Sequence, residues 1–257
     1  MSWNTNQTMN TYASIHPFNH AAFTIAGTGI GAMGFMWWID LSITADLAAA
    51  GIYLAAAIAV LAFGARVDAL RHFNPANQIT WARAAITSIL AGYSIDAPTI
   101  PPTAEFWWLI ASAAGVALAS DGLDGYVARR RGECSEFGAR FDMETDAALI
   151  LVLAILVWQT GKTGPWVLII GGMRYVFIAA GYVFPILTYS LPPSMRRKLV
   201  CVGQVVGLVL CLLPIIPGYT ASFIAAIALA SLTLSFAKDV ITLTRRTLRG
   251  QDTPVDG

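Results

Sequence analysis

Two segments decide how this sequence is interpreted: Ser120-Asp121-Gly122-Leu123-Asp124-Gly125-Tyr126-Val127-Ala128-Arg129 and Gly138-Ala139-Arg140-Phe141-Asp142-Met143-Glu144-Thr145-Asp146. They contain four aspartates, whereas only 12% of the chain is charged. If both segments are helical, Asp121 and Asp124 share one face of the first helix. Asp142 and Asp146 lie one turn apart on the second helix, with Gly138 one turn before them. The sequence therefore predicts two helices that each present a pair of carboxylates.

Carboxylates repel one another and are costly at membrane depth, so this clustering requires cations or a wet functional cavity. Oxygen ligands without a Cys or His among them favour Mg²⁺, Mn²⁺ or Ca²⁺ over zinc, and four carboxylates are more than one Mg²⁺ usually takes. We therefore expect a two-metal site, which suits phosphoryl displacement. Gly125, Ala128 and Gly138 leave room for a bulky nucleotide to approach the helix backbone.

The spacing of these residues is similar to the motif of a known family. Asp121-x2-Asp124-Gly125-x2-Ala128-Arg129-x8-Gly138-x3-Asp142-x3-Asp146 resembles, at eight specified positions, the class I CDP-alcohol phosphotransferases, which are membrane enzymes of phospholipid synthesis. The resemblance implies a six-helix transmembrane core and a homodimer. It also implies a cytidine nucleotide bound at the first half of the motif, by residues that include Gly125, Ala128 and Arg129, with Gly138 beside it.

The same resemblance implies the roles of the aspartates. Two Mg²⁺ or Mn²⁺ ions would be held by Asp121, Asp124 and Asp142, with Asp146 completing the site. Asp146 would also act as general base on the acceptor hydroxyl, which attacks the phosphoryl group attached to lipid and expels CMP.

The composition of the 257-residue chain is that of a polytopic membrane protein, because 56% of its side chains are apolar. The net charge of +1 carries little information, and we expect no nucleic-acid partner. Cys134, Cys201 and Cys211 lack the spacing of a disulfide framework or a metal site, so we interpret them as packing residues. His16 and His20 have no third ligand nearby, and we interpret them as interfacial polar residues.

We divide the chain into four parts: residues 1–64, an N-terminal tail and accessory transmembrane hairpin; 65–78, a juxtamembrane amphipathic segment; 79–249, the catalytic six-helix domain; and 250–257, a polar tail. Residues 1–20 lack the charged region of a cleavable signal peptide. The hairpin pairs apolar segments over 21–38 and 47–63. It is an addition to the family core, so the fold class is an all-α membrane protein of about eight transmembrane helices.

The core helices follow from apolar runs and proline-bearing turns. The expected ranges are 75–92, 104 into the aspartate motif, 138–158, an apolar stretch after 165 ending near 187, 199–216 and 219–248. A short amphipathic helix is expected over 66–73, ended by Pro75. Asn77, Thr80 and Arg83 resemble a pattern at the start of the family's first core helix, which places them beside the nucleotide. The alternative is helix capping and headgroup contact.

The basic residues indicate the orientation in the membrane. With eight helices nearly all Lys and Arg residues fall on one side, and only Lys162 falls opposite. By the positive-inside rule the aspartate motif faces the cytoplasm, and we expect a bacterial inner membrane.

An isolated arginine marks a candidate acceptor pocket. Arg174 lies inside an apolar stretch, where an arginine is costly unless it faces a cavity. Together with Arg196, Arg197 and Lys198 it could bind a phosphorylated acceptor. The alternative is that the residues 196–198 only follow the positive-inside rule.

The main functional hypothesis is transfer of a phosphatidyl group from CDP-diacylglycerol to a small hydroxylated acceptor, similar to glycerol 3-phosphate or an inositol phosphate, with release of CMP. The alternatives are transfer of a phosphoalcohol from a CDP-alcohol to diacylglycerol, or a non-phosphorylated acceptor such as serine or choline. An ion-coupled transporter would also place aspartates in the membrane, but usually with internal repeats, and the aspartate pattern occurs once. Aspartate-rich prenyltransferases usually carry two acidic motifs far apart in sequence.

Overall fold

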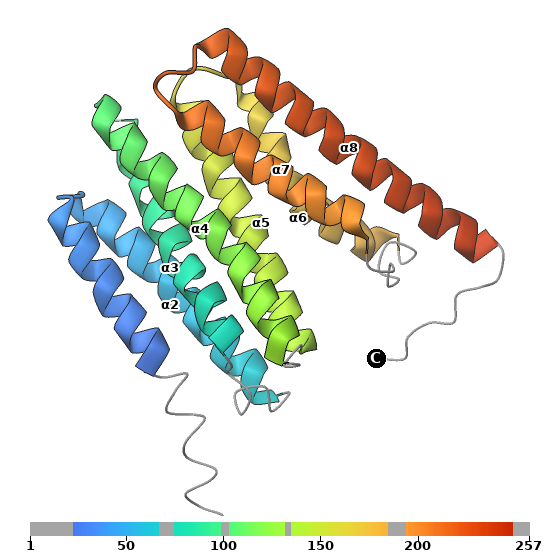
Figure 1. Cartoon of the computed structure of the whole chain (residues 1–257), viewed down its shortest axis with the longest axis horizontal. Helices are drawn as coiled ribbons and strands as arrows, with labels where there is room; N and C mark the ends of the chain where they lie inside the picture. The colour runs from blue at the N-terminus through green and yellow to red at the C-terminus, as the bar shows by residue number, and fades with distance from the viewer. Residues whose placement is uncertain (1–22, 67–74, 99–102, 132–134, 185–193, 249–257) are drawn as a thin grey trace, which may run out of the picture. The chain divides into compact units, whose positions relative to one another are not determined.

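The computed structural model describes residues 23–66, 75–98, 103–131, 135–184 and 194–248 (Figure 1). Inside these ranges the description of side chains excludes residues 63–66, 121, 123–131 and 246–248. The predicted N-terminal tail, His16, His20, Cys134 and the amphipathic segment over 67–74 all lie outside the described residues. All regular secondary structure in the described ranges is helical, which confirms the predicted all-α fold.

The helices follow the predicted order. Residues 23–38 are helical, and the following elements are α2 (Ile43–Arg66), α3 (Pro75–Asp96), α4 (Ala104–Arg131), α5 (Glu136–Gln159), the short 3₁₀ helix η2 (Pro165–Val167), α6 (Leu168–Val183), α7 (Met195–Leu212) and α8 (Gly218–Leu248). The helix of residues 23–38 and α2 form the predicted N-terminal pair. α4 runs without a break into the aspartate motif, as expected.

Three described stretches are long and apolar enough to cross a membrane: Ile43–Ala62 in α2, Pro165–Val183 in η2 and α6, and Gly218–Arg245 in α8. Ala104–Ser120 is a shorter apolar helix that leads to the motif. The first half of α5 carries charged residues, and α3 buries polar ones. Such helices are typical of membrane proteins in which polar side chains face a functional interior rather than lipid.

The chain divides into two compact units. The first contains the described residues of 1–101 and 113–146, and the second contains those of 102–112 and 147–257. α4 and α5 contribute to both units, and the motif-bearing part of each belongs to the first.

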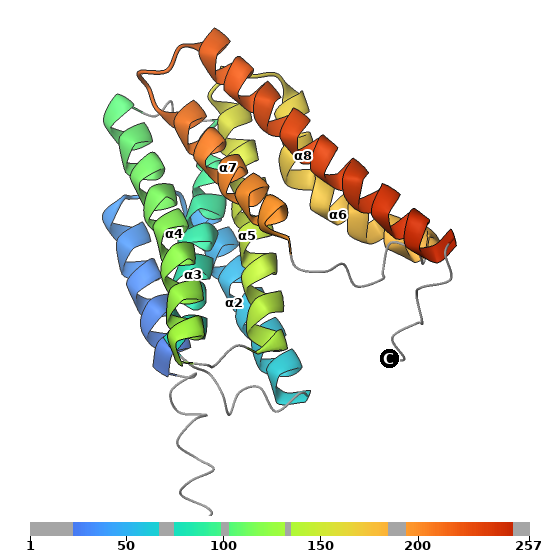
Figure 2. The same cartoon turned by 45° about the vertical axis from the view of Figure 1, so that its right-hand side comes forward.

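In the first unit, α2 packs along α3, as both views show (Figures 1 and 2). The helices come close together at Gly92 of α3. A Cβ atom at this position would lie 2.6 Å from Ala49 Cβ and 2.7 Å from the Ala45 carbonyl oxygen. Only glycine allows the two backbones this separation.

A second contact between these helices involves the buried carboxylate of Asp96, the last residue of α3. It accepts hydrogen bonds from the backbone N–H of Ser42 at 2.8 Å and from Ser42 Oγ at 2.5 Å. Ser42 Oγ also accepts from the Ala45 N–H at 3.2 Å, in the manner of a helix N-cap. Because these hydrogen bonds satisfy the Asp96 carboxylate, α3 continues to Asp96, past its predicted end at Gly92.

In the second unit, α7 packs against α8. Lys162, in the turn after α5, donates from Nζ to the carbonyl oxygens of Cys211 at 3.1 Å and Leu213 at 2.6 Å. It thereby satisfies carbonyls at the C-terminus of α7. α7 ends at Leu212, before the expected Ile216, because Pro214 and Pro217 follow. Cys201 and Cys211 are free thiols, and Cys211 is fully buried.

Candidate functional site

The start of α5 sets the position of the second aspartate pair. Ser135 caps this helix, since its Oγ accepts from the Gly138 N–H at 3.0 Å and its carbonyl oxygen accepts from the Ala139 N–H at 3.0 Å. The helix is then regular through Asp142 and Asp146. A spacing of four residues places both carboxylates on one face, as the sequence predicted.

Both carboxylates contact the same cation, the guanidinium of Arg83 on α3. Arg83 Nη1 donates to Asp146 Oδ1 at 2.6 Å, and Nη2 donates to Asp142 Oδ1. The Arg83 side chain is 1% exposed, whereas the side chains of Asp142 and Asp146 are 36% and 20% exposed. A planar guanidinium can hold two separate carboxylates in fixed directions, so Arg83 fixes the relative position of the two aspartates.

The pairing of Arg83 with the aspartates was not predicted from the sequence, in which Arg83 was expected beside the nucleotide. One signal was available in the sequence, because an arginine within an apolar helix requires a partner. Which carboxylate pairs with Arg83 depends on how α3 packs on α5, and this packing cannot be predicted from the sequence alone.

The other two predicted residues of α3 are buried in the same region. Asn77 and Thr80 are each 3% exposed. A Cβ atom on Gly138 would lie 2.8 Å from Asn77 Oδ1, so the absence of a side chain at 138 allows Asn77 to pack against the start of α5. Thr80 Oγ1 donates to the Ala76 carbonyl oxygen at 3.2 Å within α3. The structure therefore brings Asn77 and Gly138 together, while the nucleotide-binding roles of Asn77, Thr80 and Gly138 stay predictions.

The first half of the motif is on α4. The α4 backbone is helical through Arg131, which confirms the helical geometry assumed for Asp121 and Asp124. The side chains of Asp121, Asp124, Ala128 and Arg129, and the surroundings of Gly125, lie outside the description. Their predicted roles stay predictions.

The described carboxylates fit a divalent-metal site. Asp142 and Asp146 offer hard oxygen ligands, are partly exposed, and already converge on a single cation. Among the described side chains there is no group of three His, Cys, Asp or Glu residues that could hold a metal, and the two further predicted ligands, Asp121 and Asp124, are not among those side chains. The described pair thus corresponds to half of the predicted site.

The residues predicted for the acceptor lie in the second unit. Arg174 is partly buried on α6, and Lys198 is exposed on α7. The Arg197 side chain is 31% exposed, with Nη1 3.9 Å from Asp239 Oδ1 on α8. Their role in an acceptor pocket stays a prediction.

Arg196, next to Arg197, shows how the basic start of α7 is accommodated. Its Nη1 donates to the Ser235 carbonyl oxygen at 2.8 Å and to Ser235 Oγ, and its Nη2 donates to Asp239. Cations are unfavourable at a helix N-terminus, and these bonds to α8 offset that cost. α7 therefore begins at Met195, earlier than the expected Leu199.

A comparison with protein families agrees with the motif. The family model described as CDP-alcohol phosphatidyltransferase matches residues 73–236, which include α3, the aspartate motif, α5, α6 and α7. No curated protein and no solved structure matches the chain.

Proposed function

Because the chain belongs to the CDP-alcohol phosphatidyltransferase family, we propose that it transfers a phosphatidyl group from CDP-diacylglycerol to a small hydroxylated and phosphorylated acceptor, with release of CMP. Family and helices together make it an integral membrane protein and a transferase. The family match supports transfer in general, and the choice of donor and acceptor is what we propose.

The observation that carries the proposal is that Asp142 and Asp146 both pair with one buried guanidinium, that of Arg83. Two carboxylates on one helix face that share one guanidinium form a site for cations and for the diphosphate that these cations would bind. Because both carboxylates are partly exposed, they stay accessible to ions and substrate, which supports phosphoryl transfer over a buried structural ion pair.

In the proposed reaction, the oxygen of the acceptor hydroxyl attacks the phosphorus atom that carries the diacylglycerol. The bond from this phosphorus to the bridging oxygen of the diphosphate breaks, and CMP leaves with that oxygen. Asp146 accepts the proton of the hydroxyl as general base. Arg83 orients Asp146 through its Nη1 hydrogen bond, so that the carboxylate keeps a fixed direction during proton transfer.

Asp121, Asp124, Asp142 and Asp146 would hold the two Mg²⁺ or Mn²⁺ ions, which supply positive charge to the diphosphate and the leaving CMP. Asn77, Thr80, Gly125, Ala128, Arg129 and Gly138 are the proposed nucleotide-binding residues. For Asn77 and Gly138, the support is their close approach at the start of α5.

Arg174, Arg197 and Lys198 are the proposed acceptor-binding residues. Cations in or beside membrane helices suit an acceptor that carries its own phosphate, such as glycerol 3-phosphate or an inositol phosphate. We further propose that the protein is a homodimer, as the family resemblance implies. We also propose that its aspartate motif faces the cytoplasm, because the Lys and Arg residues are concentrated on that side of the predicted topology.

The proposal is tested with the purified full-length protein in detergent or proteoliposomes. CMP release is measured from CDP-diacylglycerol with a panel of acceptors, in Mg²⁺ and in Mn²⁺, and separately from CDP-choline or CDP-ethanolamine with diacylglycerol. We expect CMP only with CDP-diacylglycerol and a phosphorylated acceptor, and none from Asp146→Asn. Release with the CDP-alcohols and diacylglycerol would instead establish the opposite direction of transfer, and release with serine would replace the acceptor.

A further inference from the structure

The N-terminal helix pair lies outside the family match, which begins at residue 73. The hydroxyl of Tyr53 on α2 links this pair internally and to α3. This hydroxyl donates to the Ile25 carbonyl oxygen at 2.5 Å, lies 2.7 Å from Thr28 Oγ1, and accepts from Trp81 Nε1 at 2.8 Å. One hydroxyl thus joins the helix of residues 23–38, α2 and α3.

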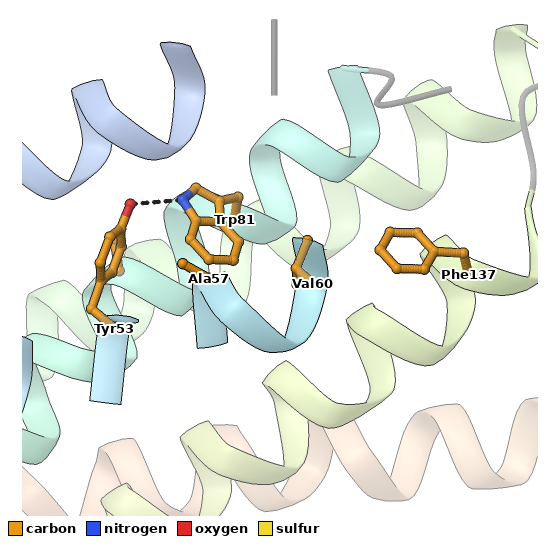
Figure 3. Close-up of a cluster of buried hydrophobic side chains, with 6 residues drawn as sticks. Tyr53, Ala57, Val60, Trp81 and Phe137 are labelled. Carbon is orange, nitrogen blue, oxygen red and sulfur yellow. Dashed lines mark hydrogen bonds between the residues drawn. The ribbon is translucent and has the colours of Figure 1, made fainter. Parts of the chain in front are cut away.

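Figure 3 shows Tyr53 and Trp81 facing each other with this hydrogen bond between them, among the apolar side chains of Ala57 and Val60. The rings of Tyr53 and Trp81 meet edge to face, with centroids 5.3 Å apart. Trp81 is fully buried, and its indole N–H has its partner in the hairpin. A buried indole N–H without a partner would be costly, so this bond fixes the orientation of the ring.

On the opposite side, Trp81 reaches the helix that carries the aspartates. Its ring stacks on Phe141 of α5, with centroids 5.8 Å apart and an angle of 27° between the planes. Phe141 stacks in turn on Phe137, with centroids 6.2 Å apart. Phe141 directly precedes Asp142, the residue that Arg83 contacts.

α3 therefore contacts two consecutive residues of α5 through two of its own side chains: Trp81 stacks on Phe141, and Arg83 pairs with Asp142. Any rotation or shift of α3 that frees Trp81 also displaces the guanidinium. Tyr53 holds Trp81 from the other side, so the hairpin contacts the same segment of α3 that carries Arg83.

We infer that the accessory hairpin is a positioning element of the aspartate site, acting through Tyr53 and Trp81. Tyr53 and Trp81 are positioning residues, because Tyr53 acts on Trp81, and Trp81 acts on Phe141, the neighbour of Asp142. The inference rests on the proposed function, because it takes Asp142 and Asp146 to be metal ligands.

The chain offers a matched control for this inference. Ser42 also joins the hairpin to α3, through its bonds to Asp96, but at the end of α3 remote in sequence from Arg83. Ser42→Ala removes three side-chain hydrogen bonds from the same region: one to Asp96 and two at the α2 N-terminus, to Thr44 Oγ1 and the Ala45 N–H. It weakens the attachment of the hairpin without touching the Tyr53 and Trp81 contacts.

The experiment compares full-length wild type with Tyr53→Phe, Trp81→Phe, Ser42→Ala and Tyr219→Phe, the last at a tyrosine that is 81% exposed on α8. Mn²⁺ alone is the probe, and its binding is measured from the electron paramagnetic resonance signal of the free ion. Thermal unfolding and CMP release are measured on the same samples. Tyr53→Phe keeps the ring and removes only the hydroxyl, and Trp81→Phe keeps an aromatic ring for Phe141.

We expect Tyr53→Phe and Trp81→Phe to bind Mn²⁺ about five-fold more weakly, less than the roughly 10- to 100-fold loss typical when a direct partner of a metal ligand is removed. CMP release should fall in parallel. Ser42→Ala should lower the unfolding temperature yet keep wild-type Mn²⁺ affinity, and Tyr219→Phe should change neither.

Unchanged Mn²⁺ affinity in both Tyr53→Phe and Trp81→Phe overturns the positioning role, as does an equal loss in Ser42→Ala, which would show an effect of general stability. The results distinguish a failure of the positioning role from a failure of the proposed transfer reaction. A wild type that binds Mn²⁺ but releases CMP from no CDP donor refutes the proposed function and leaves the positioning role to be decided by Mn²⁺ affinity.

Discussion

Asp146 accepts a hydrogen bond from Arg83 Nη1 at 2.6 Å across a separation of 63 residues in the chain. This bond links the residue proposed as general base to a fully buried cation on another helix. The same guanidinium contacts Asp142, so a single side chain determines the geometry of both carboxylates. Substituting Arg83 therefore changes how the two carboxylates are oriented while leaving both aspartates in the chain.

Replacing Arg83 by methionine should lower CMP release about 10- to 100-fold, because the aspartates lose the partner that orients them. Arg83→Lys keeps the charge, but a single ammonium cannot hold two carboxylates in fixed directions, so its rate should also fall. The control is Arg245→Met on the exposed surface of α8. Wild-type rates in Arg83→Met would show that the ion pairs have no part in turnover.

Asp146→Asn should abolish transfer while retaining more nucleotide binding than Asp121→Asn. The reason is that an amide cannot accept the acceptor proton, whereas Asp121 belongs to the half of the motif proposed to bind the nucleotide. Binding of CDP-diacylglycerol and the rate of CMP release are measured on both variants. Similar residual turnover in the two variants would contradict the assigned roles.

Gly138→Ala should destabilise the protein, because the new Cβ would lie 2.8 Å from Asn77 Oδ1 and 3.0 Å from Ser135 Oγ. We expect a loss of about 1–3 kcal/mol, the range for overpacking in a close-packed interior. In the double variant with Asn77→Ala, the main obstacle is removed, so the losses should be less than additive. Thermal unfolding of the wild type and the three variants measures this coupling, and strict additivity would argue against the contact.

Arg174→Ala should raise the acceptor concentration needed for half-maximal rate and leave the corresponding concentration of CDP-diacylglycerol unchanged. A cation that contacts only the acceptor phosphate contributes to the binding of that substrate alone. Lys238→Ala, which removes an equal charge from an exposed position of α8, is the matched control. An unchanged acceptor requirement in Arg174→Ala would exclude this arginine from the pocket.

The order of the helices and the position of Asp142 and Asp146 on one helix face could be predicted from local sequence alone. Apolar runs and prolines indicated the helices, and the spacing of Asp142 and Asp146 placed them one turn apart because helical periodicity is a property of the backbone. The errors were at helix ends. α3 continues to Asp96 because Ser42 satisfies that carboxylate, and Ser42 directly precedes another helix, α2.

By itself the sequence determined which residues share a helix face, and hence that carboxylates are paired within α5. Only the tertiary structure decided that Arg83 meets both of them, that Asn77 packs on Gly138, and that Tyr53 holds Trp81. The physical reason is that the pitch of a helix is set by neighbouring residues of one segment. The choice of which faces meet depends on the volumes and polar groups of segments far apart in the chain, and packing satisfies these together.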